Sequence, residues 1–362
     1  MNWLLIFLGF SALIVLHEAG HFFAAKATGM RVERFFLFFP PKLVSIRRGD
    51  TEYGIGAIPL GGFVKISGMN PDEELPPEAK GRGYYDQPVW KRIVVIGAGP
   101  AVNIVLAFAI LFVLAFGASD VNQTVGQVVP GTPAAGLLKP GDEIVAVDGR
   151  RHPGLGLEER LTRFVEQVGT HRCAGQQVDG CRAATPVALT VRRDGELRRI
   201  AVRPEFDAEV GRTRVGFGYG SEPADLGAVA AAARSVDVMW NVASRTATVF
   251  ANILDPEQRK EVSGVVGISV VGNQIIDISV ERSLLLLALV SLSLGLINLF
   301  PFLPLDGGHI FWSLVEKLRR KPVPFAVMER AGAIGFVLVI MLFFIGLTND
   351  IDRINGDGFG VR

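Results

Sequence analysis

The chain carries almost no net charge, few histidines and only two cysteines. Its 37 basic and 36 acidic side chains leave a net charge of +1, which gives no reason to expect a nucleic-acid partner. Only five histidines are available as metal ligands. The cysteines, Cys173 and Cys181, have seven residues between them and either close a small disulfide loop in an oxidising compartment or remain free thiols. With His171 they supply three ligands and no fourth, which argues against a structural zinc site.

Long apolar runs dominate what is present. Hydrophobic residues make up 49% of the 362 positions and the mean hydropathy is positive, which predicts an integral membrane protein with a soluble part. A membrane span needs roughly 20 apolar residues. The candidates are residues 2–25, 93–117, 283–305 and 331–347. The first candidate lacks the basic start of a signal peptide, so we expect it to remain as a helix of the mature protein.

The first apolar run contains the sequence His17-Glu18-Ala19-Gly20-His21, an HExxH motif. Positions four apart lie on one face of a helix, so His17 and His21 can present ring nitrogens to one metal ion, with Glu18 beside them as a base. A chance match on a solvated helix is the alternative. Ionisable side chains within a span are costly and are usually kept for function, which favours the metal site.

A catalytic zinc ion usually takes three protein ligands and keeps one open position, so one ligand remains to be found. Asp306 and His309 are the candidates, because the other two histidines lie in the long segment between the second and third spans. Asp306 is also the only acidic residue in the third apolar run and its flank. Two prolines shortly before it, Pro301 and Pro304, interrupt the helix and let the carboxylate turn inward.

Between the first two spans, the sequence is rich in aromatic and β-branched residues and is punctuated by glycine. This pattern predicts strands at residues 42–46, 52–58 and 61–68. Exposed backbone cannot lie in lipid, so protein must bury this sheet or the sheet must line a wet cavity. Its edge at Phe63, Val64 and Lys65 is a candidate for holding a substrate as an added strand.

The long segment between the second and third spans predicts further strands, at residues 125–129, 142–149 and 187–191. The stretch from Pro130 to Asp142 resembles the signature of a PDZ domain, and a generic small β-domain is the alternative. PDZ domains bind peptides as a strand added to an open sheet edge. Residues 227–254 are spaced as an amphipathic helix, which either lies at the membrane interface through Trp240 and Phe250 or packs on the soluble domain.

Basic residues near the span ends predict the orientation. They gather between the first and second spans and between the third and fourth, which places both connections in the cytosol. The N-terminus, the long segment and the C-terminus are then outside. In the second span, the sequence Gly97-Ala-Gly-Pro100 is interpreted as small residues for close helix packing, because no soluble strand precedes it as a dinucleotide-binding loop requires.

Together, the HExxH motif, the later sequence from Asn298 to Asp306 (Asn-Leu-Phe-Pro-Phe-Leu-Pro-Leu-Asp) and the PDZ-like segment between them resemble the site-two protease family over most of the chain. More narrowly, they resemble the bacterial regulators of sigma-factor release, which are multi-pass proteases of the inner (cytoplasmic) membrane. The resemblance implies zinc (Zn2+) bound by His17, His21 and Asp306, with Glu18 as catalytic base. It also implies that Asn298 contacts the substrate backbone or the developing oxyanion.

By the same resemblance, the substrates are single-span membrane proteins, either anti-sigma factors or signal-peptide remnants, that are cut within the bilayer. Residues 61–65 resemble the family's membrane-associated β-hairpin, and residues 98–103 resemble its second-span motif. There are two departures. Several relatives have two PDZ domains where this chain shows one, and residues 264–267 are Gly-Val-Val-Gly where the family often has Gly-Pro-Val-Gly.

The expected fold is an α-helical polytopic membrane protein with four transmembrane helices, a membrane-associated β-hairpin or sheet and an inserted extracytoplasmic PDZ domain. The expected divisions are residues 1–118 (first two spans), 119–210 (PDZ), 211–282 (interfacial helical segment) and 283–362 (last two spans). The expected activity is that of a zinc endopeptidase, and a metal transporter or a non-catalytic PDZ scaffold is the alternative. A transporter needs polar groups in several spans, whereas the second and fourth runs offer only Asn103.

Overall fold

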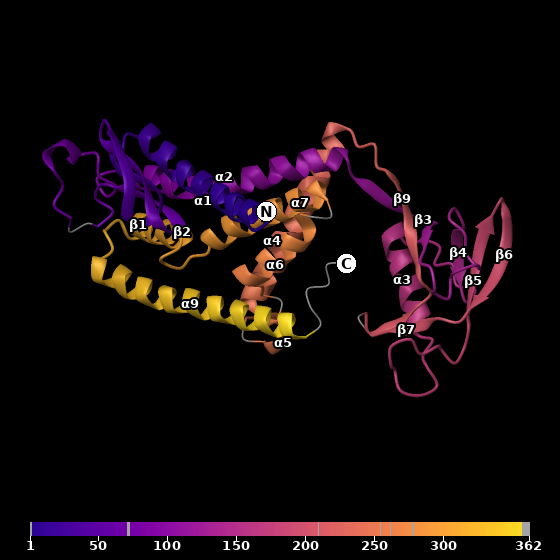
Figure 1. Ribbon diagram of the computed structural model, residues 1–362. Coiled ribbons are helices and arrows are strands. Elements are labelled where there is room, and N and C mark those ends of the chain that lie inside the picture. The colour runs from indigo at the N-terminus through magenta and orange to yellow at the C-terminus, as the bar shows by residue number, and fades with distance from the viewer. Residues whose placement is uncertain are drawn as a thin grey trace. The chain divides into compact units, whose positions relative to one another are not determined.

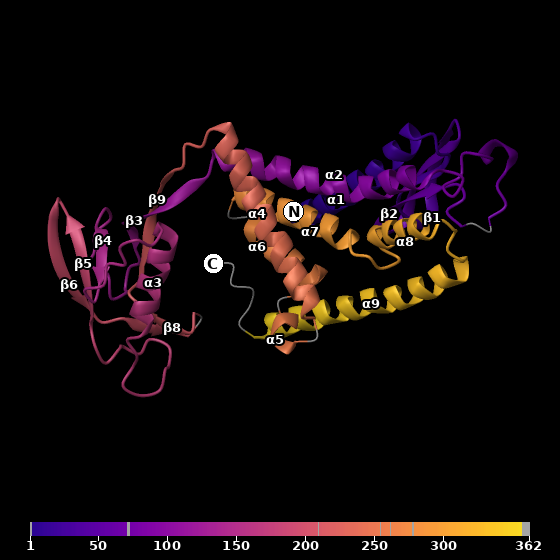
Figure 2. The same cartoon turned by 180° about the vertical axis from the view of Figure 1, so that it is seen from behind.

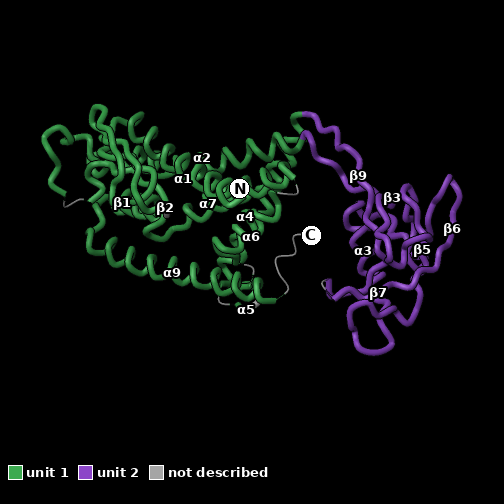
Figure 3. Tube along the Cα trace, viewed as in Figure 1, with its two compact units in different colours: residues 1–115, 228–362 green, residues 116–227 purple. Residues whose placement is uncertain are grey.

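The computed structural model describes residues 2–70, 73–208, 210–253, 255–260, 262–276 and 279–356. The chain forms two compact units, the first made of residues 1–115 and 228–362 and the second of residues 116–227 (Figure 3). The second unit is therefore an insertion between two halves of the first. The expected PDZ segment ends at residue 210, whereas the compact unit continues to Gly227, because two strands beyond residue 210 complete it.

Helices dominate the first unit (Figure 1). They are α1 (Asn2–Ala27), α2 (Val89–Phe116), α4 (Ala228–Ala251), α5 (Pro256–Arg259), α6 (Val265–Ile276), α7 (Val280–Asn298), α8 (Asp306–Arg319) and α9 (Phe325–Asn355). Within the described residues, α1, α2, α7 and α9 are long and apolar enough to cross a membrane. The four predicted spans are thus present as helices, and the chain has the features of a polytopic membrane protein.

The third predicted span differs from the structure at its C-terminal end. It was expected to run to residue 305, but α7 ends at Asn298 and a separate helix, α8, begins at Asp306. Pro301 and Pro304 lie in the non-helical connection, where their fixed backbone and missing N–H groups prevent the helix from continuing. The interruption that the prolines predicted is therefore present, and it places Asp306 at the start of a new helix.

Helices α1 and α2 pack closely enough to exclude a side chain at their crossing. A Cβ atom added to Gly20 would lie 2.6 Å from the carbonyl oxygen of Ala98. Only glycine fits at such a separation, as small-residue packing between membrane helices requires. This contact fixes the position of α1 along α2 at Gly20, the residue just before His21.

The sheet of the first unit consists of β1 (Val32–Arg48) and β2 (Thr51–Ile66), and each strand doubles back on itself. Residues 32–37 pair on one side with 62–66 and on the other with 52–55, while 42–48 pair with 51–56. The expected separate strand at 61–68 is instead the last part of β2, and Gly61 lies at the bend with a positive φ of 155°. Among the described strands, none pairs with the outer edge of residues 62–66.

Helices α4, α6 and α9 complete the first unit (Figures 1 and 2). Helix α4 crosses α7, so the amphipathic segment belongs to the same compact unit as the long apolar helices. The buried carboxylate of Asp350 in α9 accepts hydrogen bonds from the backbone N–H groups of Gly264 (3.0 Å) and Gly267 (2.7 Å). This caps the N-terminus of α6, so the Gly-Val-Val-Gly segment has a defined role as a helix start.

The second unit is a five-stranded antiparallel sheet with one helix, α3 (Leu157–Gly169), against it. The sheet order is β6 (Glu196–Val202), β5 (Val187–Arg193), β4 (Glu143–Val147), β3 (Ser119–Val128) and β9 (Phe217–Pro223). A separate hairpin joins β7 (Glu205–Asp207) to β8 (Arg212–Arg214). Leu161 and Phe164 of α3 pack on Ile144, Leu189 and Val191 of the sheet, and this apolar core makes the unit compact.

Cys173 and Cys181 form a disulfide in the second unit, so the free-thiol alternative is excluded. His171 does not join them in a ligand cluster. Its Nε2 lies 2.8 Å from Oδ2 of Asp148, and its Nδ1 lies 2.9 Å from Oγ1 of Thr185. This imidazole therefore ties two loops of the unit together.

Candidate functional site

The HExxH motif lies on α1 with both histidines facing into the first unit. His17 and His21 are buried, at 7% exposure each, and their ring centroids are 4.9 Å apart. Their Nε2 atoms are separated by 3.2 Å. The motif's spacing of four residues on a helix is the cause, because it stacks the two side chains on one face.

Asp306 joins the two histidines from the start of α8. Its Oδ2 atom lies 3.1 Å from Nε2 of His17 and 3.3 Å from Nε2 of His21. In the described part of the chain, these three residues are the one group of three or more potential ligands whose ligand atoms all lie within 4.8 Å of one another. The structure therefore brings Asp306 together with His17 and His21, although Asp306 and His21 are 285 positions apart in the sequence.

The three ligand atoms are placed as donors to a shared cation. Oδ2 of Asp306 is buried and makes no hydrogen bond of acceptable geometry within the described residues, despite lying so close to two imidazole nitrogens. A buried carboxylate oxygen without a partner is costly. Two imidazole nitrogens and one carboxylate oxygen are also the donor set that zinc accepts in catalytic sites, with a fourth position left open. The residues therefore fit a divalent cation such as zinc.

Neighbours on α2 hold the two imidazoles in orientation. Nδ1 of His21 lies 2.9 Å from the carbonyl oxygen of Val95, and donation to that oxygen leaves Nε2 free as a ligand. Nδ1 of His17 lies 3.2 Å from the side-chain amide of Asn103. Gly99 lies between these contacts, and a Cβ atom added there would lie 2.2 Å from Nε2 of His21.

Glu18 is positioned beside the sheet of the first unit. The backbone N–H of Val64 lies near its carboxylate. A Cβ atom added to Gly62 would lie 3.1 Å from Cγ of Glu18, so the strand approaches the glutamate closely. Val64 lies opposite Phe35 of β1, and its N–H approaches Glu18, so we assign this N–H to the outer edge of residues 62–66. The outer edge of the strand therefore faces the candidate base.

The other two predicted substrate-contacting residues of this strand have protein partners. The ring of Phe63 stacks on Phe36 (5.4 Å between centroids) and on Phe39 (6.1 Å). The ammonium group of Lys65 pairs with Glu33 at 2.8 Å and Glu73 at 2.9 Å, and these hydrogen bonds raise the pKa of Lys65. Both side chains thus stabilise the strand, and the backbone is the part of it that remains available for pairing.

Asn298 and His309 flank the connection that leads to Asp306. Asn298 is the last residue of α7, and its Nδ2 donates to the carbonyl oxygen of Leu294 at 3.0 Å. His309 lies one turn into α8 and is not part of the group whose ligand atoms converge. Of the two candidates, Asp306 is therefore the one whose carboxylate lies beside the two imidazoles.

Several residues that shape the site were not identified from the sequence. Val95 acts through its backbone carbonyl group, which gives no distinctive sequence signal, and Gly99 was interpreted from the sequence only as a small residue for helix packing. Asn103 did give a distinctive signal, because it is the only polar side chain between residues 93 and 116. A polar group so isolated in an apolar helix usually has a buried partner.

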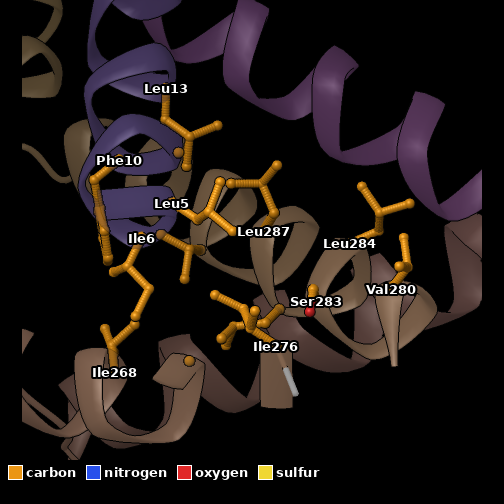
Figure 4. A pocket seen from close by; sticks show the side chains of 14 residues that line it. Leu5, Ile6, Phe10, Leu13, Ile268, Ile276, Val280, Ser283, Leu284 and Leu287 are labelled. Atoms are coloured by element: carbon orange, nitrogen blue, oxygen red, sulfur yellow. The ribbon is translucent and has the colours of Figure 1, made fainter. Parts of the chain in front are cut away.

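An apolar cavity of about 300 Å³ lies between α1, α6 and α7 (Figure 4). Its walls include Ile6, Phe10 and Leu13 of α1 and Leu284 and Leu287 of α7. None of the three convergent ligands lines it, so it is separate from the metal cluster. Leu13 is nevertheless one helical turn from His17 on the same helix.

Comparison with known proteins identifies the family. The family model described as "Peptidase family M50" matches residues 5–342. The zinc metalloprotease Rip1 of Mycobacterium tuberculosis (strain H37Rv) is 30% identical over 403 aligned residues, which cover 94% of this chain and 94% of the relative. The zinc metalloprotease Rip1 of Mycolicibacterium smegmatis is also 30% identical, with 94% of each chain covered. The chain therefore belongs to peptidase family M50.

Proposed function

We propose that this protein is a zinc-dependent endopeptidase that hydrolyses peptide bonds within membrane-spanning segments. His17, His21 and Asp306 are the proposed metal ligands, and Glu18 is the proposed catalytic base. The observation that carries the proposal is the convergence of one carboxylate oxygen and two imidazole nitrogens within 4.8 Å at a buried position. Membership of a peptidase family supports the reaction class, and the zinc metalloprotease names of the relatives support zinc as the metal.

The chain's own residues account for the proton transfers. A zinc ion held by His17, His21 and Asp306 would supply a Lewis acid able to lower the pKa of water to about 7 and to polarise a carbonyl group. Glu18 takes the proton of the attacking water and later passes it to the leaving amine. Val95 and Asn103 hold the imidazoles in the orientation that metal binding requires. The Val64 N–H lies near the Glu18 carboxylate and is proposed to orient it between these steps.

The outer edge of residues 62–66 is the proposed substrate-holding element. A helical segment hides its peptide bonds in internal hydrogen bonds, so it must be unwound before hydrolysis. An extended segment added to this edge would exchange those bonds for backbone pairing, as in other cases of strand addition. The edge faces Glu18, which would place the added strand beside the base. Asn298 is proposed to contact the substrate backbone or the developing oxyanion from the end of α7.

The proposed substrates are single-span membrane proteins, such as anti-sigma factors or signal-peptide remnants. Four helices of spanning length support a location in a bacterial inner membrane. The distribution of basic residues supports an active site that opens to the cytosol, with both termini and the inserted unit outside. The inserted unit is proposed to act as a PDZ domain, and its open edge strand β9 supports this role.

The proposal is tested with the full chain in proteoliposomes that also contain a single-span reporter. Glu18→Gln removes the base and keeps the size of the side chain, so reporter cleavage is expected to fall by at least about 100-fold. Zinc content, measured on the same sample, is expected to match that of the parent protein, because Glu18 is not a ligand. Glu74→Gln changes an exposed carboxylate of the loop after β2 and serves as the control. Cleavage that persists in Glu18→Gln would remove Glu18 from the mechanism.

A further inference from the structure

A buried ion pair joins α2 to the helix that carries Asp306. Arg92, in the first turn of α2, donates to both carboxylate oxygens of Glu316 near the end of α8, at 2.9 and 2.7 Å. The arginine is only 3% exposed. Its guanidinium carbon also lies 5.8 Å from the ring centroid of Tyr84 and 5.2 Å from that of Tyr85. Two parallel hydrogen bonds and two aromatic contacts define both the direction and the distance of this pairing.

The same face of α2 also holds the other two metal ligands. Arg92, Val95, Gly99 and Asn103 are spaced by three or four residues, so they form one stripe along the helix. Val95 and Gly99 contact His21, and Asn103 contacts His17. Contacts with α2 therefore position both α1 and α8.

Helix α8 has its two ends fixed by different means. At its N-terminus, the preceding segment wraps the first turn so closely that a Cβ atom on Gly307 would lie 2.2 Å from the carbonyl oxygen of Leu299. At the other end, ten residues and about 15 Å further along the axis, Glu316 is tied to α2. A short helix between two non-helical connections can otherwise rotate or slide, and such a movement would carry Asp306 away from the histidines.

We propose that Arg92 and Glu316 are positioning residues for the third metal ligand. By fixing α8 in rotation and height against α2, the pair sets the place of the Asp306 carboxylate relative to Nε2 of His17 and His21. The proposal rests on the proposed function, because it takes these three residues as the ligands of zinc. It predicts that weakening a contact some 15 Å from Asp306 along α8 lowers the affinity for the metal.

The test measures zinc affinity of the full chain in detergent, by competition with a chromophoric chelator. Arg92→Lys keeps the charge but loses the paired hydrogen bonds, and Glu316→Gln loses the charge. Each is expected to weaken zinc binding by about tenfold or more, the range seen when residues that orient metal ligands are replaced. Exchanging the partners, with Arg92→Glu and Glu316→Arg together, restores the pair and is expected to recover part of the affinity.

A matched control separates positioning from general stability. Arg193 makes an equally close paired contact with the buried Asp142 in the second unit, at 2.7 and 2.6 Å. Arg193→Lys is expected to leave zinc affinity unchanged. The thermal unfolding of each metal-free variant is recorded in parallel, so affinity is compared only among folded samples.

The outcomes distinguish the inference from the proposed function. Parent protein that fails to bind zinc overturns the proposed function itself. Parent protein that binds zinc, together with folded Arg92→Lys and Glu316→Gln variants of unchanged affinity, overturns only the positioning role and makes the pair a stability contact. Reduced affinity in both single variants, with recovery in the exchanged pair, supports the proposal.

Discussion

The side-chain amide of Asn103 lies 3.2 Å from Nδ1 of His17, and this contact determines which nitrogen of His17 is free to bind a metal. Oδ1 of Asn103 is buried and has no hydrogen-bond partner in the described part of the chain. The oxygen and nitrogen of a side-chain amide are nearly indistinguishable in shape. Rotating the Asn103 amide by 180° exchanges them and places Oδ1 of Asn103 against Nδ1 of His17. Nδ1–H of His17 then donates to Oδ1, the unpaired oxygen is satisfied and Nε2 keeps its lone pair for the ion.

Replacing Asn103 with alanine is therefore expected to weaken zinc binding by about 10- to 100-fold, because His17 loses the group that fixes its tautomer and ring orientation. The measurement is zinc affinity by chelator competition. Ser291→Ala is the control, since Ser291 donates only to the backbone carbonyl of Asn103. Equal zinc affinity in Asn103→Ala and the parent would show that the amide does not orient the ligand.

Gly99→Ala is expected to abolish cleavage of a membrane-embedded reporter. The added methyl group would lie 2.2 Å from Nε2 of His21, so the imidazole must leave its position or α2 must move away from α1. Gly97→Ala is the matched control on the same helix. Its added Cβ would lie 3.9 Å from its nearest neighbour, Cδ1 of Ile310, so it should be tolerated. Similar activity of both variants would contradict the close approach.

Val64→Pro tests the edge that is proposed to hold the substrate. Proline removes the N–H group that faces Glu18 and cannot pair with an added strand. Cleavage of the reporter should fall strongly, whereas Val64→Ala, which keeps the N–H group, should retain activity. Zinc content is measured in both variants. Unchanged cleavage by a zinc-loaded Val64→Pro variant would count against substrate addition at this edge.

The stability of the second unit is expected to depend on pH through Asp142. Paired hydrogen bonds from Arg193 hold the pKa of Asp142 below its ordinary value, although burial acts in the opposite direction. In the unfolded chain an aspartate titrates near 3.9. The pair therefore contributes its full stability above about pH 4, and this is lost as the pH falls through the lower pKa of the folded state.

Hydrogen exchange of the second unit in the full-length protein measures this dependence. Amide protection of β4 and β5 should decrease as the pH falls below about 4, after correction for the intrinsic exchange rate. Asp142→Asn should make protection lower at neutral pH and less dependent on pH. Asp194→Asn, at the exposed turn between β5 and β6, should behave as the parent does.

The sequence was sufficient to predict features that follow from local patterns. The four long apolar runs correspond to α1, α2, α7 and α9. The small residues of α2 correctly predicted that another helix packs closely against it. Ala98 of α2 contacts Gly20 of α1, and Gly99 of α2 contacts His21 of α1. The prolines before Asp306 correctly predicted an interrupted helix. Each of these features depends on composition or spacing within a short stretch, so no tertiary contact was needed to predict them.

Features that depend on distant contacts were not predictable in the same way. Arg92 and Glu316 are separated by 224 positions, and neither lies in a recognisable motif. Strands β1 and β2 double back because residues 32–37 pair with a different segment on each side. The alternation of apolar and polar residues along one strand does not reveal such pairing. Strand β9 pairs with β3 at the other end of the second unit, and such a pairing of distant segments leaves no local signal in the sequence.

The coordination shell of zinc tests the central claim most directly. X-ray absorption of the zinc-loaded Asp306→Cys variant is compared with that of the parent, in which both cysteines are joined in a disulfide. If Asp306 is a ligand, the variant gains one sulfur neighbour at about 2.3 Å, while the parent shows only nitrogen and oxygen neighbours. Zinc bound at parental affinity in Asp306→Cys, with no sulfur in its shell, would contradict coordination by this residue.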